Sequence, residues 1–224
     1  VIGVLTVAKS KILRRWRLVD NMLTDAFNEG KENVKYLQAL DKYTEPLYSG
    51  PPSSIVEGLP GLMNNLKMTM TISRYYNTTE RMTSLFSKVT NQMINKCKQF
   101  LTSHGRLWDQ KPDVLLSNLQ WCINLNNSYQ EYYRVTKKNL AGQPKSKQFD
   151  FNEKHIFGKF EIFCKRLQKL QDLFSTIQHF STLAKQNLDI DGIESLMRTF
   201  STLENGFKKK PYDLCDFNST QFDR

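Results

Sequence analysis

The sequence predicts an all-α fold, an elongated bundle of about six helices with no sheet. Apolar residues recur at spacings of three and four over most of the 224 residues, which places them on one face of each helix. No segment has a convincing strand pattern. The hydrophobic content is 39% and the mean hydropathy is -0.53, as expected if apolar stripes lie on rods rather than in a globular centre. The start at Val1, without a Met, and the end at Arg224 are interpreted as the limits of a piece of a longer chain.

The first expected helix runs from Leu5 to Tyr43 and would be about 60 Å long. Adjacent prolines in the segment 49–54 predict a break after it, because they remove two backbone donors. Pro60 is expected at the first position of a second helix that continues toward Tyr75. The predicted buried face of the first helix consists of Ile12, Trp16, Val19, Leu23, Ala26, Val34, Leu37 and Leu40.

The segment Ile72 to Ile94 predicts a capped corner between the second and third helices. Asn77 stands three residues before Glu80, the spacing of a capping box, and Thr78 is an equally suitable cap. The third helix then presents an apolar stripe made of Met82, Phe86, Val89, Met93, Cys97 and Phe100.

Three more helices are expected. The fourth carries Leu115, Leu119, Cys122, Leu125, Tyr129 and Tyr132 and stops near Leu140. The fifth begins after Asp150 with the stripe Ile156, Phe160, Phe163, Leu167, Leu170, Phe174 and Ile177, and the sixth covers Ile193 to Phe207. Gly and Pro in 141–147 predict a linker. Within one elongated domain, residues 1–140 are therefore expected to form a helical bundle and 148–224 a second helical hairpin.

The net charge of +10 is spread along the chain, with one concentrated run near the start. That run contains Lys9, Lys11, Arg14, Arg15 and Arg17 and has no acidic residue before Asp20. At about 100° per residue the five cations spread around a helix and form no single stripe. A solvated helix end and a contact with an acidic protein or tubulin both remain open. Nucleic acid is the least favoured partner, and we predict no nucleic-acid binding.

The sequence offers no residues for catalysis, a cofactor or a metal ion. None of the glycines begins the G-x-x-x-x-G-K pattern of a nucleotide-binding loop, and the four cysteines lack zinc spacing. We expect reduced, packed cysteines. Asn187, Asp189, Asp191 and Gly192 are spaced as in a calcium loop, but Arg198 stands where the bidentate Glu is required. A helix turn with Asp191 as its cap is expected instead. The segment itself is therefore predicted not to be an enzyme.

Three stretches of the sequence resemble the tail of dynein heavy chains, in the part called N-terminal region 1. They are I-S-R-Y-Y-N-T-T-E-R-M-T-S-L-F at Ile72 to Phe86, F-D-F-N-E-K-H-I-F-G-K-F-E-I-F-C-K-R-L at Phe149 to Leu167, and K-P-Y-D-L-C-D at Lys210 to Asp216. Two further runs, Gly58 to Met68 and Leu107 to Gln110, are more similar to axonemal heavy chains, in particular outer-arm ones, than to cytoplasmic ones.

The resemblance implies a helical tail that associates heavy chains and binds intermediate and light chains. Through docking proteins on doublet microtubules, such a tail anchors the motor in the axoneme of a cilium, whereas the ATPase of the full chain lies elsewhere. The alternative from another class is a helical-rod subunit of a membrane-tethering complex. The apolar opening segment is too short to span a bilayer, and we predict no membrane segment.

Two groups of residues are candidates for a protein interface. Arg74, Tyr75 and Tyr76 precede the predicted corner, and Arg and Tyr are enriched at binding hot spots. Adjacent tyrosines on a helix point about 100° apart, so one can pack in the core while the other contacts a partner. Base stacking is the less favoured alternative for them. The second group is Arg14, Arg15 and Arg17.

Overall fold

The computed structural model describes residues 1–50, 52–143, 146–186, 191–210 and 213–220. Every regular element within these ranges is helical, and none is a strand, so the predicted all-α fold is confirmed. The α-helices are α1 (Ile2–Val7), α2 (Leu13–Thr44), α3 (Pro52–Ile72), α4 (Thr79–Thr102), α5 (Pro112–Ala141), α6 (Glu153–Lys185) and α7 (Ile193–Lys208). Two short 3-10 turns, η1 (Glu45–Leu47) and η2 (Leu107–Asp109), lie between them.

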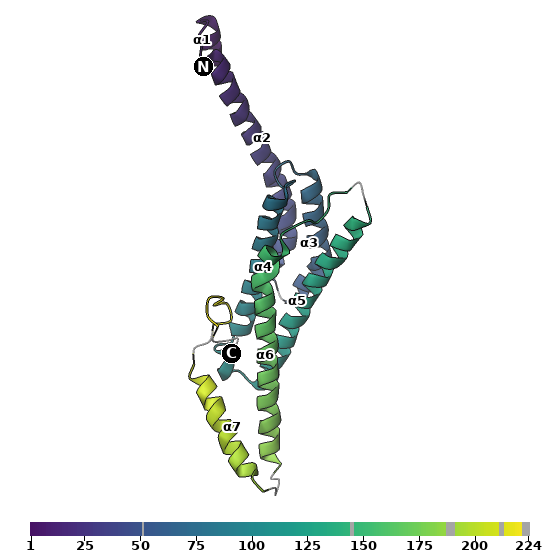
Figure 1. Cartoon of the computed structure of the whole chain (residues 1–224), viewed down its shortest axis with the longest axis vertical. Helices are drawn as coiled ribbons and strands as arrows, with labels where there is room; N and C mark the ends of the chain where they lie inside the picture. The colour runs from purple at the N-terminus through teal and green to yellow at the C-terminus, as the bar shows by residue number, and fades with distance from the viewer. Residues whose placement is uncertain (51, 144–145, 187–190, 211–212, 221–224) are drawn as a thin grey trace.

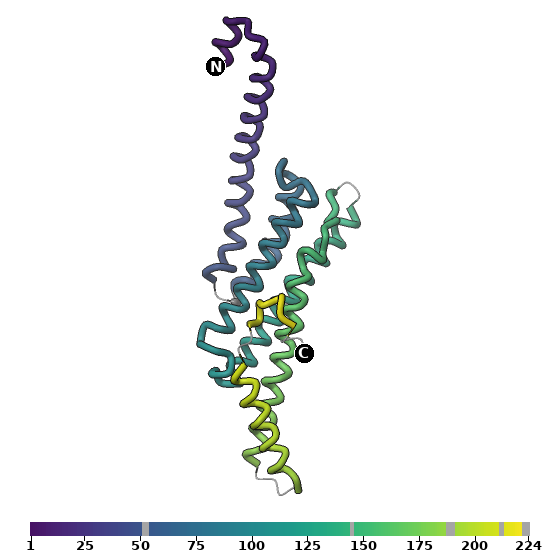
Figure 2. The backbone as a smooth tube through the Cα atoms, turned by 60° about the vertical axis from the view of Figure 1, so that its left-hand side comes forward, coloured from purple at the N-terminus to yellow at the C-terminus, as the bar shows by residue number. Residues whose placement is uncertain are grey.

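The helices form a long, narrow molecule (Figure 1). The second half of α2 packs on α3, and α3, α4 and α5 form the centre with α6, which contacts both α4 and α5. At one end α2 projects beyond the other helices and carries α1 at its tip (Figure 2). At the opposite end α6 extends past α4 and α5 and is accompanied by α7.

One continuous core joins α3, α4, α5 and α6. The stripe predicted on the fifth helix is confirmed, because all seven of its residues on α6 are buried. The stripe on α4 is buried from Met82 to Cys97, and Phe100 packs against the core partly exposed. On α5 the prediction that Tyr132 lies on the apolar face is wrong. Tyr132 is exposed, and its neighbour Tyr133 is buried instead.

The first predicted helix, Leu5 to Tyr43, is two helices. The chain turns after α1, where Lys9 has a positive φ of 48°, and the Ser10 hydroxyl accepts a hydrogen bond from the Ile12 amide. The predicted buried face is also wrong, because among its eight residues only Leu40 is buried. The other seven are exposed, with Trp16 and Leu37 at 39% each.

Pro60 does not open the second helix, which begins eight residues earlier at Pro52 and includes Pro60 in its interior. An interior proline removes one backbone hydrogen bond. Pro60 is exposed, so water can reach the helix at this point. Gly61 beside it allows close packing on α2, since a Cβ atom there would lie 2.3 Å from Cε1 of Tyr43.

The predicted helix caps differ from the observed ones. Thr78 occupies the cap position of α4, but its side chain makes no capping hydrogen bond, and α4 begins without the predicted box of Asn77 and Glu80. Asn152 caps α6 by accepting from the His155 amide. At α7 the cap is Gly192, in a left-handed conformation with φ 87°, and not Asp191. Asn187 and Asp189 lie outside the described residues, as do residues 144–145 of the predicted linker.

Arg166 connects the C-terminal segment, residues 213–219, to α6. Its side chain is 1% exposed and donates hydrogen bonds to the backbone oxygens of Leu214, Asp216 and Ser219. The guanidinium also lies 5.5 Å from the ring centroid of Phe217. Five donors in one planar group allow a single arginine to satisfy several carbonyls at once. This segment therefore packs on α6 through one buried cation.

Candidate protein interface at the α3–α4 corner

The corner between α3 and α4 is organised by Ser73, a buried residue at the end of α3. Its hydroxyl oxygen accepts hydrogen bonds from the backbone amides of Tyr75, at 3.2 Å, and Tyr76, at 3.0 Å. The same hydroxyl donates to Oδ1 of Asn33 on α2, at 3.2 Å. A serine that bonds nearby amides offers the backbone an alternative to the helix. Ser73 thereby ends α3 and fixes the corner to α2.

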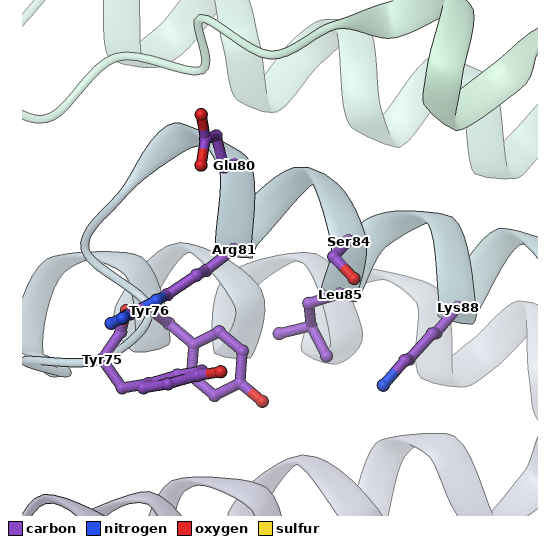
Figure 3. Close-up of a pocket in the computed structure, with 7 residues that line it drawn as sticks. All are labelled: Tyr75, Tyr76, Glu80, Arg81, Ser84, Leu85 and Lys88. Atoms are coloured by element: carbon purple, nitrogen blue, oxygen red, sulfur yellow. The ribbon is translucent and has the colours of Figure 1, made fainter. Parts of the chain in front are cut away.

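Arg81 holds the two tyrosines in a defined arrangement (Figure 3). Its guanidinium lies 4.0 Å from the ring centroid of Tyr75, and Nη1 donates to the Tyr75 carbonyl at 3.1 Å. The rings of Tyr75 and Tyr76 meet edge to face, with centroids 5.0 Å apart. Cation–π and edge-to-face contacts of this kind each contribute about 0.5–1 kcal/mol. The corner therefore presents preordered aromatic side chains at the surface.

A shallow hollow of about 210 Å³ lies beside these tyrosines. Its lining consists of Tyr75, Tyr76, Glu80, Arg81, Ser84, Leu85 and Lys88 (Figure 3). Burial, and then the neighbouring Tyr75, raise the pKa of Tyr76 above its ordinary value. Its hydroxyl is protonated at neutral pH, as that of an unshifted tyrosine would be, and it can both donate and accept hydrogen bonds. The lining combines aromatic surface with two cations and one carboxylate, and its two tyrosines and Arg81 are residue types enriched at protein interfaces.

The predicted interface residues lie in two separate places. Tyr75 and Tyr76 are half-buried in the corner, and the Arg74 side chain is 81% exposed with Nε 3.7 Å from Glu32 of α2. Arg14, Arg15 and Arg17 are exposed on the projecting part of α2, away from the corner. Arg74 thus points to Glu32 beside the two tyrosines, and the basic run lies elsewhere.

The sequence interpretation missed Ser73, Arg81 and Asn33. Serine at the end of an apolar helical pattern is a known turn former, so this signal could have identified Ser73. Arg81 lies outside the apolar stripe of the following helix, so the hydrophobic pattern gave it no role. No local signal identifies Asn33, which stands forty residues before Ser73 in the sequence.

The cysteine and histidine side chains of the chain lie outside this corner. In the described ranges no three His, Cys, Asp or Glu residues come together in a way that could hold a metal ion. Cys97 and Cys122 are buried, and burial raises the pKa of the partly buried Cys164 to about 12. A thiol with a raised pKa is a poor nucleophile, because the thiolate is the reactive form. His155 is exposed on α6. No described helix is long and apolar enough to cross a membrane.

Replacing Ser73 with Ala is expected to lower the free energy of unfolding by about 1 kcal/mol, since the amides of Tyr75 and Tyr76 and Oδ1 of Asn33 all lose their partner. Chemical denaturation followed by circular dichroism measures the change. Thr78→Ala is the control, because the Thr78 side chain makes no capping bond, and its effect should stay within about 0.5 kcal/mol. An equal loss in both variants would contradict the role of Ser73.

Comparison with known proteins identifies the family of the chain. Residues 1–224 match the family model "Dynein heavy chain, N-terminal region 1". The chain is 45% identical over 223 residues to the dynein gamma chain of the flagellar outer arm from Chlamydomonas reinhardtii, covering 100% of this chain and 5% of that protein.

Axonemal dynein relatives from mammals are equally similar. Dynein axonemal heavy chain 5 of Rattus norvegicus is 45% identical over 226 residues, and dynein axonemal heavy chain 8 of Homo sapiens is 45% identical over 225 residues, each across 100% of this chain. The chain spans only 6% and 5% of the length of these two relatives. The resemblance to dynein tails, and to outer-arm heavy chains among them, is confirmed: the chain belongs to the dynein heavy chains and corresponds to N-terminal region 1 of their tail.

Proposed function

We propose that this segment is a non-catalytic assembly element of an axonemal dynein tail. It associates heavy chains and binds intermediate and light chains, and through docking proteins on the doublet microtubules it anchors the motor for ciliary movement. Residues 1–140 and 148–224 act together as one elongated domain. The similarity to outer-arm heavy chains supports a place in the cilium axoneme.

The α3–α4 corner is the observation that carries this proposal. Arg74 is exposed beside two tyrosines that are already ordered by Arg81 and Ser73. Preordered aromatic and arginine side chains lose little conformational entropy on binding, which is why they dominate binding energies at interfaces. The corner therefore fits a protein partner, and we assign the intermediate chain to it.

The experiment compares binding of intermediate chains by two variants of the segment in the heavy-chain tail. Arg74→Ala combined with Tyr75→Ala is expected to weaken co-purification of intermediate chains at least about tenfold, the effect of losing 1.4 kcal/mol. Arg198→Ala is the control, because Arg198 is exposed on α7 and, within the described ranges, forms an ion pair with Glu194 of the same helix.

Unchanged co-purification by the corner variant would contradict the proposal. Binding to liposomes that contain anionic lipids, if it weakens with salt and occurs without any association with intermediate chains, would instead support the membrane-tethering alternative.

A further inference from the structure

The free end of α2 carries a cluster of exposed cations, which are Lys9, Lys11, Arg14, Arg15 and Arg17. The two lysines lie in the turn that joins α1 to α2, and the three arginines lie in the first two turns of α2. None of the ion pairs between described residues involves any of the five. This basic tip, residues 9–17, therefore holds positive charge that the rest of the described chain does not pair (Figure 2).

Arg14 and Arg15 point to the same side of α2 as the α3–α4 corner. Arg14 stands eighteen residues before Glu32, and Arg15 stands eighteen residues before Asn33. Eighteen residues make about five full turns of an α-helix, so the members of each pair share one direction and lie about 27 Å apart along the axis. Glu32 and Asn33 are two of the residues through which α2 contacts the corner. A partner seated on the corner and extended along this side of α2 therefore meets both arginines.

The acidic residues nearest the corner on this side of α2 are already paired within the chain. Glu29 lies 3.6 Å from Nη1 of Arg81. Glu32 lies 3.7 Å from Nε of Arg74. Asp25 is the exception, since it is exposed between the corner and the basic tip. The unpaired positive charge on this side of α2 is therefore concentrated at the basic tip.

We infer that an acidic segment of the protein bound at the α3–α4 corner extends along α2 and pairs with Arg14 and Arg15. This inference rests on the proposed function, which seats the intermediate chain on the corner, and it adds the chemistry of a second contact. A guanidinium can form two parallel hydrogen bonds with one carboxylate, and complementary charges speed association and fix orientation. Because both arginines are exposed, the contact is expected to weaken as the salt concentration rises.

The distribution of side chains around α2 favours an acidic protein over an anionic membrane. Leu23, an exposed apolar residue of α2, stands nine residues after Arg14, which is about half a turn around the axis. A helix that lies on a membrane buries its apolar face in the lipid. Arg14 would then point away from the lipid headgroups. An acidic segment that approaches from the corner side meets Arg14 directly.

Charge reversal at the basic tip tests this contact in the full-length heavy chain, with purified intermediate chains as the probe. Arg14→Glu combined with Arg15→Glu is expected to weaken their binding at least about tenfold at about 0.15 M salt, because two attractive contacts become repulsive. Lys209→Glu combined with Lys210→Glu is the matched control. It makes the same change in charge at two exposed lysines just after α7, and it is expected to leave binding unchanged.

The salt dependence of binding gives a second measurement on the same proteins. The affinity of the unchanged heavy chain for intermediate chains is expected to fall as salt is added, and the affinity of the basic-tip variant is expected to fall less steeply. The control variant should keep the slope of the unchanged chain. The inference is wrong if the basic-tip variant binds as the unchanged chain does, or if the two variants lose binding equally.

Carbodiimide coupling of the assembled complex identifies the segment of the partner. The reagent joins a lysine amine to a carboxylate that is in contact with it. Lys11 supplies one amine at the basic tip, and Arg14→Lys with Arg15→Lys supplies two more without a change in charge. Mass spectrometry is expected to find these positions joined to one stretch of the intermediate chain that is rich in Asp and Glu. Crosslinks that stay within the heavy chain would contradict the inference.

The corner variant, Arg74→Ala with Tyr75→Ala, separates this inference from the proposed function. Loss of intermediate-chain binding in the corner variant alone would uphold the proposed function and overturn the acidic contact at the basic tip. Unchanged binding in the corner variant would overturn the proposed function and, with it, a partner that spans both places. If charge reversal at the basic tip abolishes binding to anionic liposomes and leaves intermediate-chain binding intact, the tip contacts lipid and the inference fails.

Discussion

Replacing Arg166 with Met is expected to lower the free energy of unfolding by about 3 kcal/mol and to release residues 213–219 from α6. The three backbone oxygens that accept from Arg166 would lose the donor that holds them on α6. Met replaces much of the buried volume but none of the hydrogen bonds. The decrease in the free energy of unfolding therefore measures the contribution of the polar contacts. Hydrogen exchange of the amides in this segment and denaturant unfolding report the two effects.

Arg166→Lys tests whether a positive charge alone is sufficient to hold residues 213–219 on α6. An ammonium group cannot reproduce the planar guanidinium that reaches three carbonyls. Lys at position 166 is therefore expected to restore less than half of the free energy of unfolding that Arg166→Met removes. Asp213 supplies a second contact, 2.9 Å from Nζ of Lys98, and that hydrogen bond lowers the pKa of Asp213. Both groups are partly exposed, so this pair contributes only about 0.5 kcal/mol.

Arg198→Ala is the control for the loss of a positive charge. Its pair with Glu194 spans one turn of α7 at the surface, and such pairs contribute a few tenths of a kcal/mol (about 0.3). If Arg166→Met is no more destabilising than Arg198→Ala, the C-terminal segment does not depend on the buried cation.

The sequence correctly predicted the helices that bury one face. It predicted poorly the features that depend on individual side-chain hydrogen bonds. The stripe on α6 was predicted completely, because a helix packed on two neighbours must place its apolar residues at helical spacing. The same spacing was misleading on α2, where seven of the eight predicted core residues are not buried. Periodicity shows that a helix has an apolar face, but it does not show whether the partner lies within the same 224 residues.

The α3–α4 corner illustrates a different limit of prediction from sequence. Tyr75 and Tyr76 were selected from residue type alone, and their place in an interface stays a prediction. The structure shows that the two rings meet edge to face and that Arg81 packs on Tyr75. The expected cap at Asn77 or Thr78 was wrong in its hydrogen bonding, since Ser73 makes the bonds that order the turn. Those bonds depend on Asn33 across a tertiary contact with α2, and local sequence patterns carry no information about such a contact.

Replacing Phe86 with Ala is expected to cause the largest loss of stability, about 3–5 kcal/mol. Phe86 is fully buried, and its ring centroid lies 5.6 Å from Tyr133, 5.5 Å from Phe149 and 5.2 Å from Phe151. The cavity would remove packing from helix α4, helix α5 and the segment that precedes α6. Phe27→Ala is the control, because Phe27 is 62% exposed on α2 and its loss should change stability by less than about 0.5 kcal/mol.

The same variant tests whether residues 1–140 and 148–224 unfold together. Phe86 belongs to the first part, and Phe149 and Phe151 to the second, so one aromatic cluster spans the predicted linker. If the two parts form one cooperative unit, Phe86→Ala shifts a single unfolding transition to lower denaturant concentration with an unchanged slope. Two transitions, of which the variant moves only the first, would show that the parts fold independently.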